Sequence, residues 1–477
     1  MLAGGGLVLG IHASGCTRRE ENADFQPNLW LTVKTDNTVS IVISRSEMGQ
    51  GVRTALAMLV AEELDADWNV IEVVQAETQD IYGSLATAGS TSIRDLWIPL
   101  RQAGASARLM LLQAAAETWK VDATQCVTVN SQVIHPPSGR FMSYGDLTRV
   151  AALQPVPQNP PLKSLKNFRL VGQSVPRLDN LDKVTGQARY GIDQHIPGLK
   201  YAAIRQSPVF GGAVKEYDKT VVLGKPGIHA VVNLGSAVAV VADSWWQAQQ
   251  AVESLPIHWQ GGDTTLDDAA IQREYRTLLD QPGTIETESG EFDPSIPARQ
   301  VVANYEAAFQ AHATMEPMNC TVRLSDGLCE IWAPTQHPQY ARDQVKAKLQ
   351  SGMAKIMGKV KDAIGVADDS IRLHTTLLGG GFGRRLEQDY VLQAVDIAQQ
   401  TGLPIKLIWS RSEDTQHDFY RPFTSHRLEA DIDTQGNLLS WRHRVVGPSH
   451  GRSTGGAHLP YLIPHYRLDY HVKKISV

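Results

Sequence analysis

The stretch Gly379-Gly380-Gly381-Phe382-Gly383-Arg384-Arg385 is the part of this chain that best predicts how it folds. Residues 371–378 before it alternate in the manner of a strand, and residues 390–398 after it repeat apolar side chains at helical spacing. Glycine has no Cβ and a free backbone, so amide N–H groups in such a loop can turn toward an anionic ligand. Strand, glycine loop and helix in this order predict a phosphate-binding unit, although a plain turn would look the same.

The composition is that of an ordinary folded protein and narrows the possible partners. The 477 residues are 42% hydrophobic and 20% charged, with a net charge of −5, and the length allows two or more domains. Without a basic excess, we expect no nucleic acid as a partner. The four cysteines, Cys16, Cys126, Cys320 and Cys329, form no C-x-x-C pair, so the sequence encodes neither a disulfide framework nor its own iron–sulfur site.

The N-terminus allows two interpretations. Residues 2–11 (LAGGGLVLGI) are small and apolar like the central region of an export signal, but no charged region precedes them. We favour a clipped signal over an apolar terminus without a function. Residues 1–24 are therefore predicted to be the remnant of an export signal or a disordered N-terminus.

Hydrophobic periodicity predicts a chain of mixed α and β structure. Strands are expected at 29–35, 39–44, 70–76 and within 231–242, and helices at 54–67, 99–120 and 246–255. The proline-rich residues 155–161 (PVPQNPP) cannot form regular secondary structure, which predicts a linker. The expected fold class is α+β, with several domains and mixed sheets packed by helices.

Three further motifs of small or polar residues accompany strand ends and helix starts. They are Gly49-Gln50-Gly51 within EMGQG, Gly89-Ser90-Thr91-Ser92, and Gln336 within PTQHP. Each has an ordinary interpretation, as a strand-to-helix turn, a helix N-cap and a rigid proline turn. Each could also place amide or hydroxyl groups against a phosphate.

Taken together, these motifs resemble the molybdenum-binding subunits of the xanthine dehydrogenase and aldehyde oxidase family. The resemblance also rests on residues 177–186 (RLDNLDKVTG) and 312–319 (HATMEPMN), so it extends over nearly the whole chain. It is strongest for the isoquinoline 1-oxidoreductase beta-subunit group. In most of the family EMGQG follows the GGGFG loop, whereas here it precedes that loop, and this permuted order is similar to that group.

The resemblance implies a molybdenum held by the dithiolene of a molybdopterin cytosine dinucleotide, with no protein ligand to the metal. The backbone around Phe382 would pack against the metal's oxo face, and Gln336 would hydrogen-bond an oxo ligand, which makes these two the expected catalytic residues. We hypothesise that Arg384 and Arg385 contact a cofactor phosphate or a partner protein. The implied cofactor-binding residues are Gly49, Gln50, Gly51, Gly89, Ser90, Thr91, Ser92, Gln336, Gly380, Gly381, Phe382, Gly383, Arg384 and Arg385.

The resemblance also implies a division into domains. After the N-terminal remnant at 1–24, we expect a permuted molybdopterin-binding segment at 25–150 and a proline-rich linker at 151–170. An α/β-hammerhead-like domain at 171–300 would follow. A second molybdopterin-binding domain at 301–477, incomplete at its C-terminus, would end the chain.

One element that the resemblance implies is missing. In the family, a Gly-Glu-Pro segment near the C-terminus carries the general-base glutamate, and no such segment occurs here. The one Glu-Pro pair is Glu316-Pro317, which matches a different, earlier element. The resemblance therefore implies a truncated chain or one half of a split protein, without catalytic turnover of its own.

The implied function is that of the molybdopterin-binding subunit of a molybdenum hydroxylase. It would oxidise an aldehyde or an N-heterocycle with water as the oxygen source and pass electrons to a small subunit with two iron–sulfur clusters. A cytochrome c subunit is a further candidate partner. The expected location is the periplasm, after export of the folded complex, with the cytoplasm as the alternative.

Two other functions are compatible with the residues. The chain could be a cofactor-binding module that becomes active only with a second polypeptide. The glycine loops could also bind a nucleotide in an unrelated α/β enzyme, but no G-x-x-x-x-G-K-S/T motif supports this reading.

Overall fold

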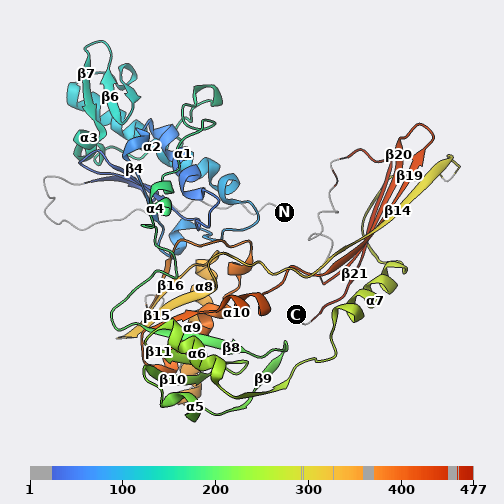
Figure 1. Ribbon diagram of the computed structural model, residues 1–477. Coiled ribbons are helices and arrows are strands. Elements are labelled where there is room, and N and C mark those ends of the chain that lie inside the picture. The colour runs from blue at the N-terminus through green and yellow to red at the C-terminus, as the bar shows by residue number, and fades with distance from the viewer. Residues whose placement is uncertain are drawn as a thin grey trace. The chain divides into compact units, whose positions relative to one another are not determined.

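The computed structural model describes residues 24–291, 293, 295–325, 327–357, 370–448, 459 and 461–475. These residues form two compact units, the first built from the chain up to residue 201 and from 314–408, and the second from 202–313 and 409–477. The fold is α+β with mixed sheets and packed helices, as predicted (Figure 1). Apart from Asp24, the N-terminal remnant predicted at 1–24 lies outside the described residues.

The N-terminal part of the first unit is a four-stranded sheet, ordered β1-β2-β3-β4, covered by helices. Strands β3 and β4 are parallel and α1 connects them, while the other two pairings are antiparallel. A three-stranded sheet, β5-β6-β7, and a short helix, α4, follow along the chain. The bounds are β1 Phe25–Asn28, β2 Leu31–Val33, β3 Val39–Ile43, α1 Val52–Leu64, β4 Ile71–Gln75, α2 Ser92–Trp119, β5 Val127–Val129, β6 Gln132–His135, β7 Arg140–Ser143, α3 Tyr144–Ala151 and α4 Asn180–Val184.

Helix α2 begins seven residues before the predicted start at Pro99, so that prediction was wrong at this end. A proline suits the first turn of a helix because it has no N–H to donate, which is why the sequence suggested a start there. In the structure Pro99 lies inside the helix. Leu96 and Leu100, on either side of it, are buried in the core, so packing outweighs the lost backbone hydrogen bond.

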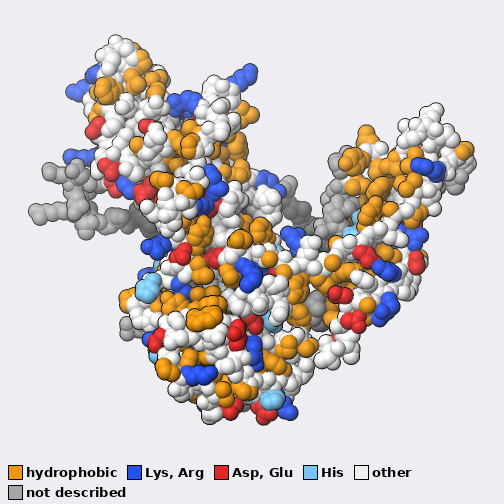
Figure 2. Space-filling view, viewed as in Figure 1, with side chains coloured by type: hydrophobic (Ala, Val, Ile, Leu, Met, Phe, Trp, Pro, Cys, Tyr) orange, Lys and Arg blue, Asp and Glu red, His pale blue; other side chains and the backbone are white. Residues whose placement is uncertain are grey.

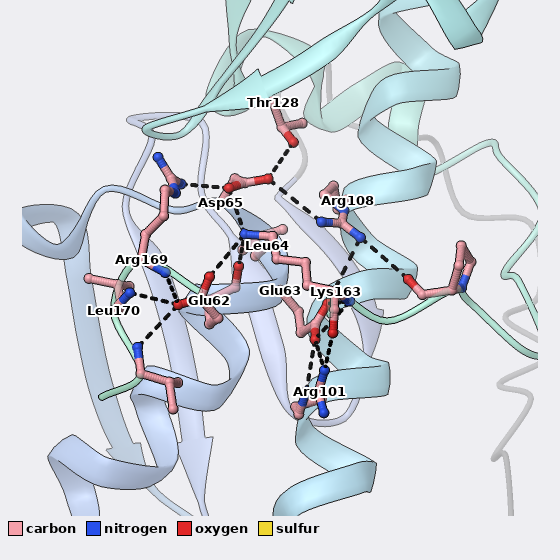
Figure 3. Close-up of polar contacts among 12 residues, drawn as sticks. Glu62, Glu63, Leu64, Asp65, Arg101, Arg108, Thr128, Lys163, Arg169 and Leu170 are labelled. Carbon is pink, nitrogen blue, oxygen red and sulfur yellow. Dashed lines mark hydrogen bonds and ion pairs between the residues drawn. The ribbon is translucent and has the colours of Figure 1, made fainter. Parts of the chain in front are cut away.

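A buried cluster of charged residues fixes the segment after the prolines to the end of α1 (Figure 3). It contains Glu62, Glu63 and Asp65 from the end of α1, Arg101 and Arg108 from α2, and Lys163 and Arg169 from that segment. Arg101 Nη2 lies 2.7 Å from Glu63 Oε1, and Lys163 Nζ lies 2.8 Å from Asp65 Oδ1. The predicted linker at 151–170 therefore lies within the first unit and does not separate the two units.

The second part of the first unit is a sheet with the strand order β18-β15-β16-β17. Strands β16 and β17 are parallel and α8 connects them, whereas β15 is antiparallel to both of its neighbours. The glycine loop lies between β17 and α9, so the predicted order of strand, glycine loop and helix is confirmed. The bounds are β15 Asn319–Ser325, β16 Leu328–Ala333, α8 Pro338–Met357, β17 Ile371–Thr375, α9 Asp389–Thr401 and β18 Ile405–Ile408.

The second unit contains a five-stranded sheet, ordered β13-β21-β20-β19-β14, and shorter strands with small helices. Strand β10 pairs with β11, and β9 pairs with β12, both antiparallel. The bounds are β8 Lys200–Gln206, β9 Gly212–Tyr217, α5 Thr220–Leu223, β10 Ile228–Asn233, β11 Ala237–Ala242, α6 Trp245–Ser254, β12 Ile257–Gly261, α7 Asp268–Leu279, β13 Thr284–Ser289, β14 Ala298–Ala307, α10 Arg411–Gln416, β19 Thr424–Asp433, β20 Leu438–Gly447 and β21 His465–Val472.

The boundaries of these units differ from the predicted domain boundaries. The chain passes between the units after residues 201, 313 and 408, whereas the sequence suggested divisions after 150, 170 and 300. The segment 171–201 belongs to the first unit because its side chains bind the loops of that unit, as described below. Residues 171–300, predicted to form a hammerhead-like domain, thus fall in both units, and that domain stays a prediction.

The described surface mixes both signs of charge, and the described cysteines are buried. On the face shown in Figure 2, basic and acidic side chains of the described residues are interspersed and form no continuous basic patch. Cys126, Cys320 and Cys329 are buried free thiols, and burial raises the pKa of Cys329 to about 12. Among the residues that the structure describes, no helix is both long and apolar enough to span a bilayer.

Replacing Glu62 by Gln should destabilise the protein in a pH-dependent way. Burial alone would raise the pKa of Glu62, but N–H groups of Leu170, Val171 and Arg169 and the Lys163 ammonium group lower it below its ordinary value. The stability from this carboxylate is therefore complete above the unfolded-state pKa of about 4.3 and is lost as the pH falls through the lower folded-state pKa.

At pH 7 we expect Glu62→Gln to lower the free energy of unfolding by about 1–3 kcal/mol, a difference that shrinks below pH 4 or so. Urea unfolding of the full chain between pH 3 and pH 7 measures this difference. Glu216→Gln, at an exposed position on β9, should cause little change at any pH. A deficit that stays constant through the acidic range would show that the charge of Glu62 is not the cause.

Candidate functional site

The side chain of Gln336 joins three separate segments of the first unit. It is 3% exposed, and its Oε1 accepts a hydrogen bond from Gly383 N–H at 3.0 Å. Its Nε2 donates to Thr87 O at 2.9 Å, and Thr87 N–H donates to Gln336 O at 2.8 Å. The PTQHP turn, the glycine loop and the segment before α2 therefore meet at one amide group.

The EMGQG segment reaches the same point. A Cβ added to Gly381 would lie 2.6 Å from both Gln336 Oε1 and the sulfur of Met48, so a larger residue would have to displace at least one of these side-chain ends. Leu378 N–H donates to Glu47 O at 3.0 Å. Four motifs that are distant in the sequence thus converge in one region of the first unit.

Phe382 lies at the tip of the glycine loop and is presented to solvent. Its φ is +54°, in the left-handed region that residues with a Cβ rarely adopt, and its side chain is 62% exposed. Such backbone strain costs about 1–3 kcal/mol and is retained where the surrounding structure enforces it. The hydrogen bond from Gly383 to Gln336 is one contact that enforces it.

Glu316 holds the start of the glycine loop. Its Oε2 accepts a hydrogen bond from Gly379 N–H at 2.8 Å, and Gly379 O accepts one from Glu316 N–H at 3.0 Å. Its Oε1 accepts from Ile192 N–H and from Asn319 Nδ2, both at 2.9 Å. The carboxylate is compensated by Arg385, whose Nη2 lies 3.3 Å from Oε2.

Arg384 and Arg385 are buried, with exposures of 1% and 0%. Arg384 forms a bidentate ion pair with Asp389, at 2.9 and 2.8 Å. Arg385 donates to Gly380 O at 2.9 Å and to Glu316 O at 2.6 Å. Both guanidinium groups thus bind groups of their own chain and brace the loop, and their proposed contact with a phosphate or a partner stays a prediction.

Glu47 has the same role in the EMGQG loop that Glu316 has in the glycine loop. It is 1% exposed, and its Oε1 accepts hydrogen bonds from Gly49 N–H at 2.9 Å and from Gly51 N–H at 3.0 Å. Its Oε2 accepts from Arg53 N–H at 3.1 Å. Glu47 also forms an ion pair with Arg177, whose Nη2 lies 3.1 Å from Oε1.

Gln50 is exposed, but its amide is already engaged by its own loop. Its Oε1 accepts from Met48 N–H at 2.8 Å, and its Nε2 donates to Ser46 O at 3.0 Å. Gln50 therefore stiffens the EMGQG loop. Met48, the residue of this loop that lies near Gly381, is only two positions away from Gln50.

The segment 89–92 leads into the N-terminus of α2. Gly89 and Ser90 are exposed and have left-handed φ values of +60° and +56°. Thr91 occupies the N-cap position without a side-chain cap, and the 28-residue helix begins at Ser92. The first N–H groups of a helix and its dipole favour an anion, so this end is suited to a phosphate.

A cavity of about 650 Å³ also lies in the first unit, between β4, β17 and residues 178–194. Its lining includes Arg53 and Leu377, which lie next to the EMGQG loop and the glycine loop. The predicted site residues do not line it. The cavity is therefore distinct from the point where Gln336, Gly381 and Met48 meet.

Sequence reasoning missed the carboxylates that organise the site. Glu47 was noted only as part of the EMGQG motif, and Glu316 only as part of the HATMEPMN motif. For Glu47 the available signal was position, because it lies just before Gly49 and Gly51, whose N–H groups need an acceptor. Glu316 lies 63 residues before the Gly379 that it binds, so no local pattern marks its role.

Comparison with known proteins finds two molybdopterin cofactor-binding domains in this chain. Residues 1–192 and residues 280–477 each match a molybdopterin cofactor-binding domain. The chain is 32% identical over 483 residues to isoquinoline 1-oxidoreductase subunit beta of Brevundimonas diminuta, covering 90% of this chain and 60% of that protein. It is 29% identical over 444 residues to the membrane-bound aldehyde dehydrogenase (pyrroloquinoline-quinone) of Gluconacetobacter polyoxogenes, covering 88% of this chain and 55% of that protein.

The solved structures are more distant. Quinoline 2-oxidoreductase from Pseudomonas putida 86 aligns with a TM-score of 0.47 and 17% identity, covering 63% of this chain and 44% of that chain. The chain spans 60% and 55% of the length of the two curated relatives above.

The chain is thus a molybdopterin cofactor-binding protein, and its residues fit such a group. The uncapped N-terminus of α2 suits the phosphates, and Gln336 gives only one of its two Nε2 hydrogens to Thr87. The chain belongs to the molybdenum-binding subunits of the xanthine oxidase family, as its motifs predicted.

Replacing Gly381 by Ala should disrupt the junction of the loops. The new Cβ would displace Gln336 Oε1 or the Met48 sulfur and so weaken the hydrogen bond from Gly383. Such overpacking costs about 1–3 kcal/mol, which urea unfolding of the full chain should detect. Gly224→Ala is the matched control because no atom lies within 4 Å of its added Cβ and its φ is −84°. Equal stability of the two variants would argue against a tight junction at Gly381.

Proposed function

We propose that this chain is the molybdopterin-binding part of a molybdenum hydroxylase that oxidises an aldehyde or an N-heterocycle. The observation that carries the proposal is the convergence of the PTQHP, GGGFG and EMGQG motifs and Thr87 around the buried amide of Gln336. The exposed residues of these loops, Gly49, Gln50 and Phe382, would lie against the bound cofactor. We propose the cytosine dinucleotide form of the cofactor, as the resemblance implies.

When bound, the molybdenum cofactor supplies a centre that inserts oxygen from water into a C–H bond and takes up two electrons. The protein residues bind and orient. Gln336 is held at Oε1 by Gly383 and at Nε2 by Thr87, so its second Nε2 hydrogen has a fixed direction and is a pre-organised donor. The N-terminus of α2 would hold a phosphate, and the exposed ring of Phe382 would form an apolar wall that excludes water.

The proposed partners follow from the chemistry and from the relatives. The name of the Brevundimonas protein indicates an N-heterocycle, and that of the Gluconacetobacter protein indicates an aldehyde, so both substrate classes remain open. The sequence contains no cysteine run for an iron–sulfur cluster. We therefore propose that electrons leave through a separate subunit with two such clusters, and that a cytochrome c subunit is a further candidate.

A second candidate function is favoured by one specific observation. These 477 residues contain no Gly-Glu-Pro segment, the segment in which the family carries its general-base glutamate, and they span 60% of the isoquinoline 1-oxidoreductase subunit that they match. The chain would then be a cofactor-binding module that needs a second polypeptide for turnover.

The test is cofactor content and turnover of the full chain, produced in a host that makes molybdopterin dinucleotides. We expect purified chain to carry molybdenum and pterin in equal amounts, and Gln336→Ala to retain about tenfold less, because it loses both hydrogen bonds at the junction of the loops. Gln435→Ala, at an exposed position in the second unit, is the control and should retain the wild-type amount.

Turnover separates the two candidates. Isoquinoline and an aromatic aldehyde, each with an artificial electron acceptor, are the substrates. Turnover by the loaded chain alone supports the enzyme, and turnover only after addition of a polypeptide with the Gly-Glu-Pro segment supports the module. A chain that binds neither molybdenum nor pterin in this host would refute both.

A further inference from the structure

Residues 177–192, which we call the strap, carry a motif that the proposed function does not use. The strap belongs to the first unit and contains α4. It begins beside the EMGQG loop and ends beside the glycine loop, and these are the two loops that meet at Gln336 and Met48.

The first end of the strap binds the EMGQG loop through a buried charge. Arg177 Nη2 donates to Glu47 Oε1 at 3.1 Å, and Arg177 Nη1 donates to Gly49 O at 3.0 Å. Lys183 Nζ lies 3.5 Å from the same Glu47 oxygen. Asp179 holds both cations in place, at 3.1 Å from Arg177 Nε and 2.5 Å from Lys183 Nζ.

The far end of the strap binds the carboxylate that holds the glycine loop. Ile192 N–H donates to Glu316 Oε1 at 2.9 Å, and Ile192 O accepts from Lys406 Nζ at 2.6 Å. A Cβ on Gly191 would lie 2.6 Å from Pro334 Cδ and 2.7 Å from Asn319 Oδ1. The strap therefore passes in close contact with the PTQHP turn before it reaches Glu316.

The two carboxylates share one design. Each is nearly buried, accepts N–H groups from a glycine loop with some of its lone pairs, and is bound by the strap with others. Without Arg177, the cation left to pair with Glu47 would be Lys183, 3.5 Å away. Without the Ile192 N–H, Glu316 would lose one of the bonds that fix its position. Each carboxylate would then be held less firmly and its buried charge would be more costly. A change in the strap should therefore be transmitted to the loop amides.

We propose that the strap positions both cofactor loops, with Arg177 as a positioning residue for the EMGQG loop and the Gly191-Ile192 end for the glycine loop. The inference rests on the proposed function only in calling these loops cofactor loops. The mechanical part, in which the strap orders the loops, holds for the chain without cofactor.

Hydrogen exchange of the cofactor-free full chain tests the mechanical part. Arg177→Ala should speed exchange of the Gly49, Gly51 and Arg53 amides by about tenfold, because Glu47 holds them less firmly. Gly191→Ala should do the same for the amide of Gly379. Arg189→Ala is the matched control, since Arg189 is an exposed arginine of the same strap.

A conservative variant keeps the test decisive if Arg177→Ala does not fold. Arg177→Lys keeps a positive charge near Glu47 but loses the fork that also reaches Gly49 O, so it should speed exchange less than Arg177→Ala would. Unchanged exchange of the Gly49 and Gly51 amides in Arg177→Lys and of the Gly379 amide in Gly191→Ala would overturn the inference. Faster exchange at all amides of the first unit would overturn it too, because this would indicate general destabilisation.

Molybdenum and pterin content then separates this inference from the proposed function. In the cofactor-producing host, Arg177→Ala should retain several-fold less of both than Arg189→Ala. If the variants show the local exchange changes but no form of the chain binds cofactor, the strap inference stands and the proposed function is refuted. Normal cofactor retention by Arg177→Ala would refute the role of the strap in cofactor binding.

Discussion

The side-chain amide of Gln336 is the interaction on which the arrangement of the first unit depends. An amide offers both an acceptor and donors on one rigid plane, so it can hold two backbone segments at a fixed spacing. Here the acceptor takes Gly383 N–H and the donor reaches Thr87 O, and the amide is buried, where an unpaired polar group would be costly. The absence of a Cβ on Gly381 then brings the EMGQG loop into contact with the same group.

Buried carboxylates supply the second constraint. Glycine loops have many N–H groups that no helix or strand satisfies, and water cannot reach those that are packed. Glu47 and Glu316 accept these N–H groups, and the cations Arg177 and Arg385 compensate the charge. A carboxylate in this position orders a loop more strongly than a neutral acceptor would, because hydrogen bonds to a charged group are stronger. The loops are thus rigid before any ligand arrives.

Much of the fold could be predicted from the sequence, because periodicity reports on local burial. The strand at 371–375, the helix at 389–401 and the hairpin near 228–242 all lie close to their predicted positions. The predicted start of α2 at Pro99 was wrong because the burial of Leu96 and Leu100 outweighs the preference of proline for the first turn of a helix. The proline-rich residues 155–161 are irregular, as predicted, but Lys163 and Arg169 after them bind acids about a hundred residues earlier, and no local pattern reports such a contact. The site motifs were recognisable, but the roles of Glu47 and Glu316 depend on partners that only the folded chain reveals.

The separation of the site segments along the chain has a consequence for synthesis. Thr87 and Gln336 lie 249 positions apart, and the stretch that forms part of the second unit, residues 202–313, is made between them. A ribosome adds on the order of 5–20 residues per second, so the N-terminal loops emerge tens of seconds or less before their partners exist. During that interval they have no glycine loop to pack against, and closing so long a segment is slow. Assembly of the cofactor-binding region is therefore a late event in the life of the nascent chain, and the early loops depend on their own internal hydrogen bonds, such as those of Gln50, to persist until then.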